Sequence, residues 1–236
     1  MTTPTTDWPK PGIAVDLTIM TVTNGALHCV LMQRDDADIA GGDWAFPGGF
    51  VRPDISLDAT VTHVLQHKTG LADVHFEQLA TYGALGRDPR GHVISVVYLA
   101  LVPADRLMNQ LALQPGLKLA RVHVDWPGET GGPATAIDED GTALSLAFDH
   151  AALLGDVVKR LRGKLDYSPV GYAFLPPLFT LREVQEVHEA ILSQSLTKPA
   201  FRRKLLDRGM IQPTGERETG GAYRPAELYQ LRSEKE

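Results

Sequence analysis

The sequence predicts an α+β fold of two domains, in which a mixed β-sheet domain is followed by a mainly helical one. Residues 12–126 contain alternating apolar runs separated by turn signals, which is typical of strands joined in hairpins. From Leu144 onward the apolar residues recur at spacings of three and four, the period of an amphipathic helix. We therefore expect one domain over residues 1–144 and a second over residues 145–236.

The first domain opens with a strong local signal. Residues 12–34 predict two strands around Asn24-Gly25, because these residues readily adopt the left-handed backbone of a tight hairpin turn. The elements expected after them are a helix from about Ser56 to Thr69, strands over 75–84, 93–102 and 118–126, and a loop over the glycine-rich, acidic stretch 128–142. This order predicts a mixed α and β domain with antiparallel hairpins.

The second domain shows the pattern of two helices and a hairpin. Residues 167–179 contain three prolines and predict a linker. Thr180 and Glu183 then have the spacing of a capping box, and a further helix is expected from Thr197 to a stop at Gly209. A short hairpin follows. This is the order of a winged helix-turn-helix, whose second helix enters the major groove of DNA; a small helical cap with a solvated basic face would show the same pattern.

Charge is distributed unevenly along the chain. The formal net charge is −6, but residues 196–236 carry nine Lys/Arg and six Asp/Glu. An acidic body with a basic end favours a surface that faces nucleic acid. The single cysteine, Cys29, excludes an intrachain disulfide. The sequence shows neither a signal peptide nor an apolar run long enough to cross a membrane, so we expect a cytoplasmic protein.

Residues 48–71, GGFVRPDISLDATVTHVLQHKTGL, keep the frame of a known motif. They resemble the Nudix box, G-x5-E-x7-R-E-U-x-E-E-x-G-U, in which U is an apolar residue. With Gly49 as the first position, the last glycine falls on Gly70 and the last apolar residue on Leu71. The resemblance implies that the first domain is a Nudix-like α/β/α sandwich with a mixed sheet.

The acidic residues of the Nudix box are missing. Its glutamates and its arginine fall on Ile55, His63-Val64 and His67-Lys68, and no Asp or Glu occurs between Ala59 and Ala72. Nudix hydrolysis needs clustered carboxylates to hold divalent cations, so we expect no hydrolysis, no catalytic residue and no metal site. His63 and His67 have the spacing of a zinc-binding pair, but two ligands are too few for such a site.

Several short motifs occur in order along the rest of the chain. They are Gly86–Gly91, Phe148-Asp149-His150, Tyr167–Val170, Phe179–Leu181, Phe201–Lys204 and Arg224-Pro225-Ala226. In this order they resemble the Nudix-related transcriptional regulators of the NrtR type. The resemblance implies a dimeric repressor, without a cofactor, that binds a palindromic DNA operator of NAD-metabolism genes. It also implies that ADP-ribose or a related nucleotide metabolite releases the operator.

The candidate binding residues follow from charge and position. A diphosphate requires cations and backbone amides, so the candidates for the ligand are Arg34, Gly48, Gly49, Arg52, Arg87 and Arg90. Arg52 stands where it could partly replace the lost metal ion, and Trp44 and Phe46 are candidates for stacking on a base. The candidates for DNA binding are Lys198, Arg202, Arg203, Lys204, Arg217 and Arg224, with Phe201 and Leu205 expected to face the core.

Two other functions stay open at this point. One is a Nudix hydrolase of a nucleoside diphosphate derivative with a non-standard acid set, whose C-terminal domain serves only association. The other is a protein-interaction module, which would leave Arg202 to Lys204 unexplained. Metal-dependent turnover of a nucleotide substrate would distinguish the hydrolase from the regulator.

Overall fold

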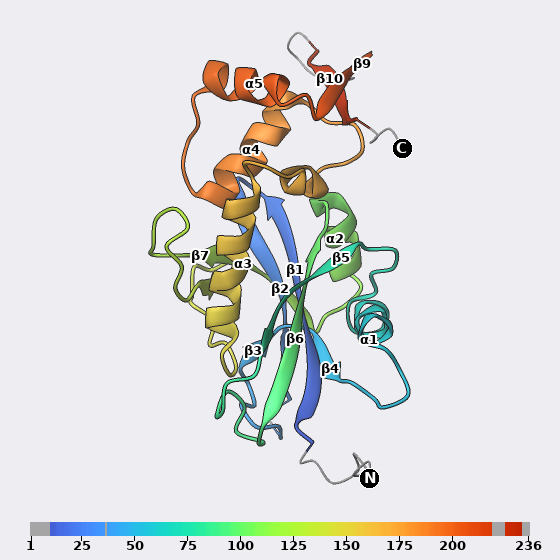
Figure 1. Ribbon diagram of the computed structural model, residues 1–236, viewed down its shortest axis with the longest axis vertical. Helices are drawn as coiled ribbons and strands as arrows, with labels where there is room; N and C mark the ends of the chain where they lie inside the picture. Colours follow the sequence, from blue (N-terminus) through green and yellow to red (C-terminus); the bar gives the residue numbers. More distant parts are fainter. Residues whose placement is uncertain (1–9, 36, 219–224, 233–236) are drawn as a thin grey trace, which may run out of the picture.

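The computed structural model describes residues 10–35, 37–218 and 225–232. These residues form a body around one large β-sheet and, beyond one end of it, a smaller group of helices with a two-stranded sheet (Figure 1). No helix in the described ranges is long and apolar enough to span a membrane.

The sheet of the body has eight strands and is mixed. The strands are β1 (Gly12–Thr23), β2 (Ala26–Gln33), β3 (Trp44–Ala45), β4 (Gly48–Phe50), β5 (Phe76–Tyr82), β6 (Val93–Leu101), β7 (Leu117–His123) and β8 (Thr135–Ile137). Their order is β5-β6-β1-β2-β7-β8, with β3 paired to β2 and β4 paired to β1. Strands β1 and β6 are parallel, and the other pairs are antiparallel. The predicted hairpin is confirmed, since Asn24 and Gly25 join β1 to β2 with φ angles of 49° and 69°.

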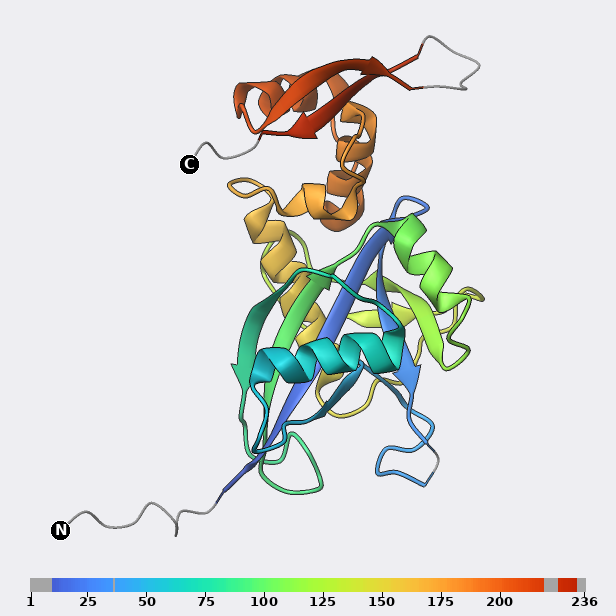
Figure 2. The ribbon, with the colours of Figure 1, turned by 90° about the vertical axis from the view of Figure 1, so that its right-hand side faces the viewer.

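Helices cover both faces of this sheet, which confirms the expected α/β/α sandwich (Figures 1 and 2). Helix α1 (Leu57–Val64), its π-helical continuation η2 (Leu65–Thr69) and helix α2 (Ala104–Leu111) lie on one face. There Val61 and Leu107 share a core with Leu17 of β1. Helix α3 (His150–Lys164) lies on the other face, where Leu154 shares a second core with Leu31 of β2. Alternation along the strands supplies both cores.

The sequence-based boundaries failed where pairing with distant residues decides the structure. The predicted loop over 128–142 contains the short strand β8, which pairs with the edge strand β7. The helix expected from Leu144 starts at His150 instead. The reason is that the backbone around Leu146 pairs with Trp44, whose amide donates to the Ser145 carbonyl at 2.8 Å. Helix α2 was not predicted.

The smaller part has the predicted winged-helix order. Its elements are the 3-10 helix η3 (Val170–Phe174), helix α4 (Leu181–Leu192), helix α5 (Lys198–Asp207) and strands β9 (Ile211–Arg217) and β10 (Glu227–Leu231). The capping box at the start of α4 is confirmed, because the Glu183 amide donates to Thr180 Oγ1 and the Thr180 amide donates to Glu183 Oε2. Gly209 follows α5 with a φ of 64°. The predicted linker 167–179 contains η3, whose Tyr172 joins the core of this part.

Helix α3 connects the two parts. Its apolar side packs on the sheet, and the same core continues into α4 through Val187 and Ile191. Arg162 of α3 is 5% exposed and donates to the carbonyl oxygens of Ile191, Trp126 and Gly128. The expected domain boundary at residue 144 stays a prediction, because α3 packs against both parts.

Candidate effector and DNA-binding sites

A cavity of about 320 Å³ lies beside the start of α3, whose first residue, His150, lines it. Strands β1, β2 and β4, the segment Arg87–Arg90 and the residues leading into α3 contribute to its lining. The lining contains four cationic side chains, Arg34, Lys68, Arg87 and Arg90, and four acidic ones, Asp16, Asp35, Asp38 and Asp88. The cavity therefore combines fixed cations for an anionic ligand with acceptors for its neutral groups.

Gly48 and Gly49 lie in the lining of this cavity, as predicted for the ligand site. A Cβ atom at Gly48 would lie 2.5 Å from Asp16 Oδ1 and 2.6 Å from the carbonyl oxygen of Val15. Gly48 therefore allows β4 to pair closely with β1. At Gly49 a Cβ would meet only Val64, at 3.9 Å, so space does not restrict that position to glycine.

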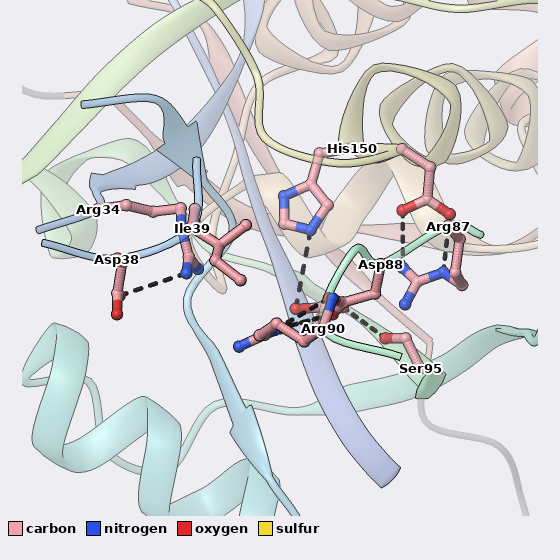
Figure 3. Close-up of polar contacts among 10 residues, drawn as sticks. Arg34, Asp38, Ile39, Arg87, Asp88, Arg90, Ser95 and His150 are labelled. Carbon is pink, nitrogen blue, oxygen red and sulfur yellow. Dashed lines mark hydrogen bonds and ion pairs between the residues drawn. The ribbon is translucent and has the colours of Figure 1, made fainter. Parts of the chain in front are cut away.

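Three predicted arginines meet in the cavity, and acidic groups hold each of them (Figure 3). Arg87 donates to both carboxylate oxygens of Asp149 at 2.7 and 2.9 Å. Arg90 is bound in the same two-pronged way by Asp88, with a shortest contact of 2.6 Å. Arg34 donates to Asp38 at 3.3 Å and to the Ile39 carbonyl at 3.0 Å.

These contacts leave one end of each guanidinium available. All three arginines use Nε and Nη2, and among the described residues Nη1 has no hydrogen-bond partner in any of them. The Arg90 guanidinium also holds the pKa of the Asp88 carboxyl below its usual range. The arginines are thus fixed in place and keep donors for a further ligand.

Aromatic rings surround the arginines, but they are not the two that were predicted to stack on a base. The Arg90 guanidinium lies 5.0 Å from the ring centre of Phe50 and 5.2 Å from that of Phe148. Phe46 lines the cavity, but it is buried and stacks on His150 with ring centres 4.9 Å apart. Trp44 does not line the cavity; the ammonium of Lys118 lies 4.9 Å from its ring centre.

Asp16, Ser95 and His150 form a polar group that the sequence did not reveal. Ser95 Oγ donates to Asp16 Oδ2 at 2.5 Å. The backbone amide of Phe46 donates to His150 Nδ1 at 3.1 Å, so that nitrogen is an acceptor and the proton of the neutral ring is on Nε2. His150 Nε2 lies 3.9 Å from Asp16 Oδ1. Burial lowers the pKa of His150, which favours this neutral form.

The Nudix-box segment contributes a cation to the cavity. The Lys68 ammonium donates to the carbonyl oxygen of Gly48 at 2.5 Å and lines the cavity. Partial burial lowers the pKa of Lys68, while the nearby Asp16 opposes this shift. His63 and His67 are exposed and stack on each other with ring centres 4.2 Å apart. Within the described residues, no group of three or more His, Cys, Asp or Glu side chains is placed to hold a metal ion.

Arg52, which was expected to replace the metal ion, is not brought to the cavity. Its side chain is 74% exposed and pairs with Asp54 at 3.4 Å. It is not among the residues that line the cavity. Lys68 of η2 lines the cavity instead.

The second candidate site is the outer face of α5. Phe201 and Leu205 are buried, as predicted, while Lys198, Arg202, Arg203 and Lys204 are exposed. Lys204 pairs with Asp166 at 2.7 Å, and Arg208 pairs with the same carboxylate at 3.0 Å. Among the described residues, Arg202 and Arg203 have no ion-pair partner. Their charges are available to phosphate or base.

Of the two predicted wing contacts, Arg217 and Arg224, the structure describes Arg217. Arg217 ends β9, is exposed and donates to the Pro225 carbonyl at 3.0 Å. Arg224 lies outside the described residues. Strands β9 and β10 lie beside α5, where a wing belongs (Figure 2), and Arg217 is on the first of them.

Family models match both parts of the chain. The NUDIX domain matches residues 11–123, and the NrtR DNA-binding winged helix domain matches residues 171–231. The matched ranges cover most of the sheet of the body and the elements α4 to β10. Together they define a class of transcriptional regulators in which a Nudix domain is joined to a winged helix.

A relative that matches almost the whole chain identifies the family within this class. The chain is 36% identical over 227 residues to the ADPR-responsive transcriptional repressor NtrR of Acinetobacter baylyi, which covers 95% of this chain and 84% of that protein. It therefore belongs to the NrtR family. Over a shorter range of 122 residues it is 40% identical to an ADP-ribose pyrophosphatase of Methanocaldococcus jannaschii, covering 52% of this chain and 61% of that protein.

Two crystal structures are similar to the fold. Shewanella oneidensis NrtR complexed with a 27mer DNA has a TM-score of 0.75 and 33% identity, covering 93% of each chain. The NUDIX domain of the same Shewanella protein complexed with ADP ribose has a TM-score of 0.51 and 30% identity, covering 67% of this chain and 94% of that chain.

Proposed function

We propose that this protein is a ligand-responsive transcriptional repressor that binds its operator through α5 and the β9–β10 wing. ADP-ribose or a related nucleotide metabolite binds in the cavity and releases the DNA. One observation carries the proposal: the same chain has a cavity lined by cationic side chains and a winged helix with exposed arginines. The repressor relative named for its response to ADP-ribose, and the Shewanella complexes, support the same assignment.

The cavity suits a nucleoside diphosphate derivative. Arginine Nη1 groups donate well to phosphate oxygens, and Lys68 supplies a further fixed charge near the Nudix-box turn. Phe50 and Phe148 offer aromatic faces for a base. Since these side chains supply the positive charge themselves, we expect the ligand to bind without a divalent cation.

Helix α3 provides a physical link between ligand and DNA. At its start, Asp149 holds Arg87 in the cavity wall, and at its end, Lys164 pairs with Glu77 at 2.6 Å. The next residue but one, Asp166, pairs with Lys204 of α5. A ligand that competes with Asp149 for Arg87 changes the contacts of this helix. It shifts the protein away from the DNA-binding arrangement only if it binds the other arrangement better.

The expected oligomer is a homodimer that binds a palindromic operator of NAD-metabolism genes. A dimer with two-fold symmetry presents two copies of α5, and such a pair matches the two halves of a palindrome. The family assignment supports this part of the proposal.

Arg90→Ala tests the placement of the ligand, and Arg52→Ala is the matched control. We expect Arg90→Ala to weaken ADP-ribose binding by roughly tenfold to a hundredfold, the effect of losing hydrogen bonds from a charged donor. Arg52→Ala removes the same charge from a position outside the lining and should change the affinity by less than about twofold. Calorimetric titration gives both values, and thermal melting checks that each variant is folded. Equal effects of the two variants would place the ligand elsewhere.

A Nudix hydrolase is the competing function, and the similarity to an ADP-ribose pyrophosphatase favours keeping it under test. The structure opposes it with Lys68 at the cavity and no carboxylate cluster on α1 or η2. We expect no nucleoside monophosphate from ADP-ribose, NADH or a sugar nucleotide after prolonged incubation with Mg²⁺ or Mn²⁺. Turnover that EDTA abolishes and that copurifies with the intact chain would establish the hydrolase instead.

A further inference from the structure

We infer that Asp16, with Ser95 and His150, recognises a hydroxyl of the terminal ribose of the ligand and so distinguishes ADP-ribose from ADP. The inference rests on the proposed function, because it assigns one part of the proposed ligand to one part of the cavity. Asp16 places a carboxylate in a cavity whose arginines and Lys68 suit an anion. A neutral group of the ligand that donates a hydrogen bond would suit this carboxylate.

The geometry leaves one oxygen of Asp16 for the ligand. Ser95 donates to Oδ2, whereas Oδ1 has no hydrogen-bond partner among the described residues. The Asp16 side chain is 15% exposed and lines the cavity, so this oxygen is open to a donor from a bound ligand. Gly48 keeps the approach open, since a Cβ there would lie 2.5 Å from Oδ1.

His150 supplies the complementary donor. Its Nδ1 accepts from the Phe46 amide, so Nε2 carries the hydrogen, and Nε2 is the ring nitrogen near Asp16. The 3.9 Å between Nε2 and Oδ1 is too long for a direct hydrogen bond. A hydroxyl group is both donor and acceptor, so one hydroxyl beside this gap can donate to Asp16 and accept from His150. A phosphate oxygen has no hydrogen to donate and is repelled by the carboxylate.

The choice of the sugar over the base follows from the surroundings. An adenine edge also has an amino donor beside a ring-nitrogen acceptor, so the choice depends on where the base stacks. Ribose offers neighbouring hydroxyls that use both groups. The aromatic faces that suit a base belong to Phe50 and Phe148, which pack on the Arg90 guanidinium.

The test compares ADP-ribose with ADP, which has the same base and diphosphate but no terminal ribose. Calorimetric titrations of the full chain should show that the unchanged protein prefers ADP-ribose. Asp16→Asn should weaken ADP-ribose binding by roughly tenfold or more relative to ADP, because a carboxylate accepts more strongly than an amide. Asp35→Asn, which removes the same charge from the cavity lining, should change both affinities by the same factor.

A second variant tests the same site in case Asp16→Asn does not fold. Ser95→Ala removes the hydroxyl that orients Asp16 and should reduce the same preference by a smaller factor, with a thermal midpoint measured for each variant. If Asp16→Asn weakens ADP and ADP-ribose equally, the carboxylate contacts the adenosine that both ligands share; if it strengthens both equally, it acts only by charge. Either result overturns the inference. Binding of neither nucleotide by the unchanged protein would contradict the proposed function itself, and this site with it.

Discussion

Arg202→Ala combined with Arg203→Ala is expected to lower operator affinity by roughly a hundredfold, since an arginine that contacts a base or phosphate contributes about 1 to 3 kcal/mol. Both side chains are exposed on α5, while Phe201 and Leu205 of the same helix are buried. The variant should therefore fold normally. It should also show a shallower dependence of affinity on salt, because fewer counterions are released from the DNA.

A matched control removes the same number of positive charges from another part of the protein. Arg52→Ala combined with Arg121→Ala removes two exposed arginines from the body of the protein. We expect operator binding of this control within about twofold of the unchanged protein, since its charges lie outside the winged helix. Mobility-shift titrations at several salt concentrations measure both. Unchanged affinity and salt dependence in the α5 variant would show that this helix does not face DNA.

Arg162→Ala should cause the largest loss of stability among the substitutions considered. The Arg162 side chain is buried, and among the described residues no carboxylate lies within ion-pair distance of it. Its charge is held by the carbonyl oxygens of Ile191, Trp126 and Gly128 and by the Trp126 ring, 4.9 Å from the guanidinium carbon. Removing it leaves several buried acceptors without donors, which costs roughly 3 kcal/mol or more.

Arg162 also connects two segments that are far apart in the sequence. The carbonyl of Ile191 lies near the end of α4, so the guanidinium caps the negative end of that helix and ties it to the loop after β7. Arg162→Lys keeps a charge but has fewer donors and should recover part of the loss. Arg121→Ala, at an exposed site on β7, should change the free energy of unfolding by less than about 0.5 kcal/mol. Urea unfolding measures all three; equal values for Arg162→Ala and Arg121→Ala would contradict this account.

Local signals in the sequence were sufficient for much of the fold. The Asn24-Gly25 turn, the capping box at Thr180 and the stop at Gly209 all depend on the conformational preferences of a few adjacent residues. They were therefore predicted correctly. Strand β8 is different, because its three residues form a strand only by pairing with β7, which lies in another part of the sequence.

The same distinction between local and distant contacts applies to the candidate ligand site. Charge and the Nudix frame identified Arg34, Arg87 and Arg90, which meet in the cavity. Arg52 was placed there for the same reason, but a residue close in sequence to the turn need not point toward it, and its side chain pairs with Asp54. Asp16 and Ser95 are 79 residues apart, so no spacing rule could join them. His150 did have a signal, since the Phe148-Asp149-His150 motif was noted without a role.

The most direct test of the central claim is a mobility-shift titration of this protein on the DNA upstream of its own gene, with and without ADP-ribose and without added metal. The account predicts a specific complex that disappears as ADP-ribose is added, while the ADP-ribose itself is recovered unchanged. A complex that persists at an ADP-ribose concentration shown by calorimetry to saturate the protein would contradict it.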